Sequence, residues 1–158
     1  MHWIGVSDWA LPAGQIHVVA SVAAEIRRLA PAALDDNRLL LVSDPTEFPE
    51  VLWGWTLDSG ELAAIGYALK HSARGDLVVL CDERAARKAC SALGLTVTGT
   101  LGLLVDAVEA GRVHSAAALD ALDRLPGEGR MHLAKAVQEA VRETLESLVT
   151  DSGRRPED

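Results

Sequence analysis

An uninterrupted apolar run, Leu77 to Leu80, lies between two segments that have the apolar periodicity of helices. Gly75 and Asp76 precede the run and Asp82 follows it, which is typical of a short strand buried on both faces. Strand and helix patterns alternate on both sides of the run, and this order implies crossover connections between parallel strands. The sequence therefore predicts an α/β fold with helices on both faces of a parallel sheet, a three-layer α/β/α arrangement.

The remaining elements follow from the same patterns. Further strands are predicted at residues 16–20, 38–43 and 95–98, and helices at residues 22–29, 62–71, 84–93 and 102–110. Ser21 is expected to cap the first helix, while Asp58 and Glu61 have the spacing of a capping box for the second. Gly94 and Gly111 are the expected ends of the third and fourth helices.

The chain is long enough for one domain with a sizeable core. We expect this domain to span residues 1–125. Residues 126–150 hold an amphipathic helix, predicted from Met131 to Val149, whose apolar stripe packs on the domain, on a second copy or on a partner. Residues 151–158 are polar and are expected to form a flexible tail.

The composition narrows the class of protein. Apolar residues make up 49% of the chain and charged residues 24%, as in an ordinary soluble globular protein. No apolar run approaches the roughly 18 residues of a membrane span, so we expect a cytoplasmic protein with no membrane partner. The formal net charge of −8 argues against binding driven only by phosphate neutralisation. It does not exclude a nuclease, because a cleft lined with carboxylates is acidic until divalent cations fill it.

The sequence lacks the residue patterns of several common kinds of functional site. Cys81 and Cys90 have neither a CxxC spacing nor a histidine partner at ligand spacing, so they are interpreted as buried thiols. The histidines have no recognisable metal spacing, and no serine stands in a nucleophile elbow. No GxGxxG or Walker pattern is present. Covalent nucleophilic hydrolysis and a nucleotide cofactor are therefore disfavoured.

Two carboxylates are placed where a parallel sheet would bring them to one rim. Glu61 opens a predicted helix and Asp82 follows a predicted strand, and α/β folds bind ligands at the carboxyl ends of their strands. Both have a structural alternative, because Glu61 completes the capping box and Asp82 is a common type of helix N-cap. The neighbouring Glu83 is a weaker candidate. The rim is a plausible metal site.

Three segments carry longer motifs, in this order: LDSGELAAI, LCDERAARKACSALGL and TGTLGLLVDAVEAGR. They resemble consecutive motifs of the PIN-domain proteins, specifically a bacterial subgroup similar to the VapC-type toxins. The resemblance covers about residues 16–125. It implies a PIN-like fold, Mg²⁺ or Mn²⁺ as cofactor, hydrolysis of single-stranded RNA, a homodimer and a small antitoxin protein as partner.

The resemblance also implies roles for individual residues. Glu25, in the segment VASVAAEIRR, matches a glutamate that helps to bind the metal, although Ala20 replaces the family's usual proline. Together with Glu61 and Asp82 it would form the catalytic, metal-binding set. The structural alternative for Glu25 is a surface residue that pairs with Arg28 on the same helix.

The N-terminal part of the chain departs from the family pattern. PIN enzymes begin with a strand that ends in an aspartate central to the metal cluster, followed by a helix and a second strand. Only 16 residues separate Asp8 from Glu25, too few for a full helix and the strand at 16–20. Asp8 is the candidate that would complete the metal set in a shortened head. Alternatively, the first strand is lost or precedes Met1.

Basic and hydroxyl side chains near the rim are candidates for contact with substrate phosphates. In the comparison with the family, Arg84 and Arg87 face the substrate cleft, and guanidinium groups suit phosphate geometry. Thr98 and Thr100 precede a helix N-terminus, where hydroxyl or backbone donors bind phosphates. The alternatives are solvated helix charges for the arginines and an ordinary strand-to-helix turn for the threonines.

Three hypotheses about function remain open. The leading one is a metal-dependent single-strand endoribonuclease, similar to those of toxin–antitoxin systems. The second is a degenerate, catalytically inactive PIN-like protein that acts as a binding or regulatory module, which the short head and the net charge favour. The third is an unrelated doubly wound regulatory domain, in which the three carboxylates do not converge. Because the head is short, we expect weak or absent RNA cleavage.

Overall fold

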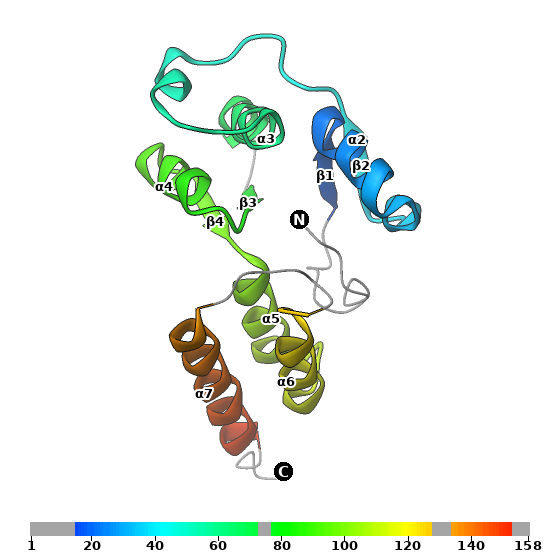
Figure 1. The fold of residues 1–158 in the computed structure, drawn as a ribbon, viewed down its shortest axis with the longest axis vertical. Coiled ribbons are helices and arrows are strands. Elements are labelled where there is room, and N and C mark those ends of the chain that lie inside the picture. The colour runs from blue at the N-terminus through cyan, green and yellow to red at the C-terminus, as the bar shows by residue number, and fades with distance from the viewer. Residues whose placement is uncertain (1–14, 73–76, 128–133, 153–158) are drawn as a thin grey trace. The chain divides into compact units, whose positions relative to one another are not determined.

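The computed structural model describes residues 15–72, 77–127 and 134–152, with side chains up to residue 148 (Figure 1). The chain divides into two compact units, one of residues 13–100 and one of residues 1–12 and 101–158. The expected boundaries after residues 125 and 150 stay predictions. Among the helices of the described ranges, none has the length and apolar character needed to cross a membrane.

The unit of residues 13–100 begins with a parallel strand pair. β1 (Ile16–Val19) lies beside β2 (Leu39–Val42) with Ile16 opposite Leu39. The connection is formed by α2 (Ala20–Leu29) and a short 3-10 turn, η1 (Pro31–Asp35). The buried side chains of Val18, Ala23 and Ile26 join the strand and helix into one small core. The two predicted strands and the helix between them are confirmed.

The start of α2 differs from the expectation. Ser21 does not cap the helix, because the helix already begins at Ala20 and has no side-chain cap on the residue before it. Instead, the backbone N–H of Ser21 donates to Asp44 Oδ1 at 3.1 Å and its hydroxyl donates to the same oxygen at 3.2 Å. An aspartate just beyond β2 therefore satisfies a donor in the first turn of α2, a cap supplied from a distant part of the chain.

The second half of this unit follows the predicted order. A connection with the 3-10 turn η2 (Glu50–Gly54) leads to α3 (Ser59–His71), then to β3 (Val78–Leu80), α4 (Arg84–Ala92) and β4 (Thr96–Thr98). α4 ends before Gly94, whose φ of 71° is one that glycine adopts without strain. The core of this half is built from small and branched side chains: Leu52, Ile65, Ala68, Val79, Ala86, Ala89, Cys90 and Leu95.

The strands form two pairs. β3 and β4 are parallel, with Val79 opposite Val97, and among the described residues no strand joins this pair to β1 and β2. α3 contacts both β1 and β3, so this helix packs against a strand of each pair. The α/β fold with parallel strands is confirmed, but the described residues hold two two-stranded sheets where one continuous sheet was expected.

The described residues of the other unit form helices. α5 (Thr100–Glu109) enters it from the first unit, and α6 (Ser115–Arg124) packs on α7 (Lys135–Ser152). Leu122 and Leu145 are fully buried in its core. An ion pair between Arg142 and Asp123 links α6 and α7. α6 was not predicted, although its apolar residues have helical spacing.

Candidate functional site at the carboxyl end of β3

Asp82 follows β3 and holds the start of α5. Its Oδ1 accepts a hydrogen bond of 2.7 Å from the backbone N–H of Thr100, and its Oδ2 accepts one of 2.6 Å from the Thr100 hydroxyl. The structural alternative for Asp82, an N-cap of α4, is wrong. Glu83 occupies that position and makes no side-chain cap bond. The Asp82 side chain is exposed, so each carboxylate oxygen keeps a further lone pair on the solvent side.

Gly99 makes this contact possible. A Cβ atom at Gly99 would lie 2.6 Å from Asp82 Oδ1, 2.8 Å from Arg87 Nη1 and 3.3 Å from the carbonyl oxygen of Cys81. Any residue with a Cβ would have to displace the Asp82 and Arg87 side chains, so glycine lets the chain after β4 approach the end of β3 this closely. The close approach of the chain therefore explains why a glycine occupies position 99 of this motif.

Arg87 ties the same rim together from α4. Its Nη1 donates to the carbonyl oxygen of Cys81 at 3.2 Å, and its side chain is partly buried. Thr98, at the end of β4, accepts a 2.9 Å bond from the Cys81 backbone N–H. The backbone N–H and the hydroxyl of Thr100, which were predicted to bind a phosphate, both donate to Asp82. The phosphate roles of Arg87, Thr98 and Thr100 stay predictions, and the structure gives each of them an intramolecular contact.

Glu61 combines a structural role with an unsatisfied atom. The capping box is confirmed, since the Glu61 N–H donates to Asp58 Oδ1 at 2.8 Å and Glu61 Oε2 accepts from the Asp58 N–H at 2.9 Å. The other oxygen, Oε1, is buried and has no hydrogen-bond partner among the described residues. Burial raises the pKa of Glu61 above its usual value. The hydrogen bond from the Asp58 N–H opposes this rise, and the negative charges of Asp58 and Glu83 add to it. A carboxylate in this state favours the binding of a proton or a cation.

Glu61 and Asp82 act electrostatically on the same thiol. Burial raises the pKa of Cys81 to about 11, and the negative charges of Glu61 and Asp82 contribute to the shift. The fully buried Cys90 also has a raised pKa, again mainly because of burial. The prediction of a buried thiol is confirmed for Cys90, whereas Cys81 is only partly buried. The charges of the two predicted carboxylates therefore both act on the Cys81 thiol.

The remaining predicted ligands do not complete a cluster in the described residues. Glu25 is exposed on α2 and makes no ion pair with Arg28, and Asp8 lies outside the described residues. Within the ranges that the structure describes, no three His, Cys, Asp or Glu side chains are grouped so that they could hold a metal ion. Gly60, beside Glu61, is buried where a Cβ would lie 3.1 Å from Val22, so packing of α3 against α2 accounts for this glycine.

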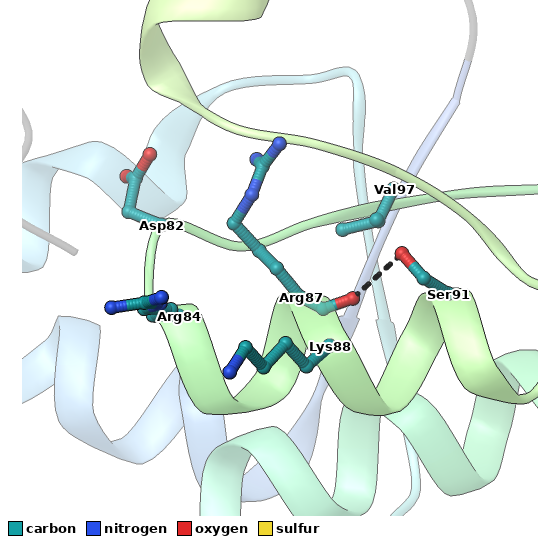
Figure 2. A pocket seen from close by; sticks show the side chains of 6 residues that line it. All are labelled: Asp82, Arg84, Arg87, Lys88, Ser91 and Val97. Carbon is teal, nitrogen blue, oxygen red and sulfur yellow. Dashed lines mark hydrogen bonds between the residues drawn. The ribbon is translucent and has the colours of Figure 1, made fainter. Parts of the chain in front are cut away.

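A pocket of about 510 Å³ lies beside Asp82 on α4 (Figure 2). Its lining consists of Asp82, Arg84, Arg87, Lys88, Ser91 and Val97. Lys88, Ser91 and Val97 were not predicted as site residues. The signal for two of them was present in the sequence, because residues 84, 88 and 91 have the spacing of one helix face.

A family model described as a PIN domain (DUF3368) matches residues 13–147. No curated protein matches the chain. No solved structure matches it either.

Proposed function

The chain belongs to the PIN-domain family, and from this premise we propose that it is a nucleic-acid-associated protein that resembles the metal-dependent single-strand endoribonucleases of toxin–antitoxin systems. The family is nuclease-like and its members generally use a divalent cation. The finer assignments, namely single-stranded RNA as substrate, Mg²⁺ or Mn²⁺ as the cation, a homodimer and an antitoxin partner, belong to this proposal.

The observation that carries the proposal is the unsatisfied Oε1 of Glu61. A buried carboxylate oxygen without a donor is costly unless a partner compensates it, and a divalent cation is such a partner. The fit to a cation is partial, because the described residues offer no group of three ligands. Glu61 and Asp82 would hold the cation, and Glu25 and Asp8 are the further carboxylates that the proposal assigns to it.

The chain's own residues have separate tasks at this rim. A bound divalent cation supplies charge stabilisation and lowers the pKa of its water. Asp58 fixes the rotamer of Glu61 through the capping box, and Thr100 fixes both oxygens of Asp82. Two carboxylates that are held in this way lose little side-chain freedom when they bind a ligand.

Cleavage of single-stranded RNA with Mg²⁺ or Mn²⁺ tests the proposal. Cleavage that EDTA stops, and that Asp82→Ala and Asp8→Ala each reduce by orders of magnitude, supports the enzyme and identifies Asp8 as a ligand. Glu139→Gln, an exposed change on α7, is the control and should leave the rate unchanged. RNA cleavage that survives EDTA or Asp82→Ala would contradict the assignment.

A second candidate function is favoured by a specific observation. The described residues lack a three-ligand group, which is what a degenerate PIN-like protein with a binding or regulatory role would show. The same assay separates the two candidates. RNA that is bound but left intact in Mg²⁺ and in Mn²⁺ supports the binding module.

A further inference from the structure

α4 carries three charged side chains, and all of them are positive. Arg84, Arg87 and Lys88 have the spacing of neighbours on one helix face, and the first turn contains no acidic residue. Arg84 opens the helix, at the end where the helix dipole disfavours a cation, and it repels Lys88 one turn later. In a chain with a net charge of −8, this concentration opposes local stability. Such local conflicts are expected at functional sites.

The three cations differ in how free they are. Arg87 is partly buried and donates to the Cys81 carbonyl oxygen, whereas Arg84 and Lys88 are exposed. Neither the Arg84 side chain nor the Lys88 side chain makes a hydrogen bond or ion pair with any other residue that the structure describes. Figure 2 shows the difference: Arg87 extends away from α4 on its own, while Arg84 and Lys88 extend together in another direction.

The pocket beside these cations suits an extended polyanion more than a compact ligand. It is open to solvent, it begins at the Asp82 rim and it runs along α4 to Ser91. Val97 gives the lining one apolar side chain, next to which a sugar or base could pack. At one end of the pocket, both carboxylate oxygens of Asp82 accept hydrogen bonds from Thr100.

We propose that Arg84 and Lys88 form a phosphate-binding subsite for the backbone of single-stranded RNA, which passes the Asp82 rim and continues along α4. Arg87 is a positioning residue that holds the end of β3 through Cys81 and does not contact the phosphate. The subsite rests on the proposed function for its choice of RNA, but it requires neither a bound cation nor cleavage.

Fluorescence anisotropy with a labelled single-stranded RNA oligonucleotide, in EDTA, measures this binding without any cleavage. The variants are Arg84→Ala, Lys88→Ala and the double variant. The charge-matched control is Arg28→Ala with Lys70→Ala, two exposed helix residues outside the pocket. Removing two phosphate contacts should make the negative slope of log K against log salt shallower by about 1.4, at about 0.7 per contact for a single strand. The control should retain the slope of the unaltered protein, and Lys88→Arg, which keeps the positive charge, should retain it too.

Each result decides the subsite. A reduced slope in the double variant alone supports it, even if the protein cleaves nothing, so failure of the proposed enzyme activity is a separate result. Equal losses in the double variant and the control would mean diffuse electrostatic attraction and would overturn it. Absence of RNA binding by the unaltered protein, or displacement of the RNA by millimolar inorganic phosphate with no dependence on Arg84 and Lys88, would overturn it as well.

Discussion

Asp82 and Thr100 are joined by two hydrogen bonds, one from the Thr100 backbone N–H at 2.7 Å and one from its hydroxyl at 2.6 Å. The aspartate that the family resemblance assigns to a metal is therefore also the anchor of α5. Loss of activity after a change at Asp82 can come from either role, so changes on the Thr100 side separate the two.

Thr100→Val removes the hydroxyl and keeps the shape of the side chain. It should lower the free energy of unfolding by roughly 1 kcal/mol, because a hydrogen bond to an exposed carboxylate is lost. Thr100→Ser keeps the hydroxyl and is the matched control. Urea unfolding of the three proteins measures the difference, and equal stabilities for the valine and serine variants would contradict the Asp82 contact.

Gly99→Ala should destabilise the protein by roughly 1–3 kcal/mol, because the added Cβ overlaps Asp82 and Arg87 and must displace them. Gly54→Ala is the control, since nothing lies within 4 Å of a Cβ at that position. Thermal unfolding of both variants tests the steric argument. If the two alanine variants are equally stable, the close approach at Gly99 is not required.

Glu61→Gln should raise the melting temperature at pH 7. Glutamine can still accept the capping-box bond from the Asp58 N–H. It carries no negative charge, whereas burial raises the pKa of the Glu61 carboxyl above 4.5 and so disfavours its charged form. Ionisation of a group with a raised folded-state pKa destabilises the folded protein, so the advantage of glutamine should vanish below pH 4.5 and grow as the pH rises through the raised value. A glutamine variant that is less stable than the unaltered protein at pH 7 would contradict the burial argument.

Millimolar Mn²⁺ should raise the melting temperature of the unaltered protein, because a ligand that binds only the folded state stabilises it by mass action. Glu61→Gln and Asp82→Asn should each reduce this gain. Glu139→Gln, on α7, should keep the full gain. A melting curve that saturating Mn²⁺ leaves unchanged would count against a cation at this rim.

Leu145→Ala should destabilise the helical unit by about 2–5 kcal/mol, the usual range for a leucine that is fully buried. Val137→Ala, two turns earlier on α7, is the control because Val137 is 47% exposed. Denaturant unfolding followed by circular dichroism measures both changes. Similar small effects at both positions would mean that α7 does not pack as the structure describes.

Local signals were sufficient for much of the fold. The Asp58–Glu61 capping box and the glycine end of α4 depend on residues a few positions apart, and both were predicted from spacing alone. α6 was missed although Ala118, Leu122 and Leu125 repeat at helical intervals.

Contacts between distant segments could not be predicted in the same way. Asp82 meets Thr100 because β3 and β4 pair in parallel with Leu80 opposite Thr98, and Asp44 meets Ser21 because β1 and β2 pair in the same manner. Both contacts depend on strand register, which no local pattern specifies. The sequence pattern correctly placed Asp82 at the end of a strand. It suggested a cap on α4, whereas Asp82 accepts hydrogen bonds from Thr100 at the start of α5.

The two strand pairs also determine which part of the fold carries its stability. With only two strands in each sheet of the described residues, every strand has one edge whose backbone groups lack a strand partner. A two-stranded sheet is marginal by itself in water, so α2, α3 and α4 must stabilise the strands through the cores that they share. In native-state hydrogen exchange, the helix amides should accordingly be protected longest, and the outward-facing strand amides should exchange first.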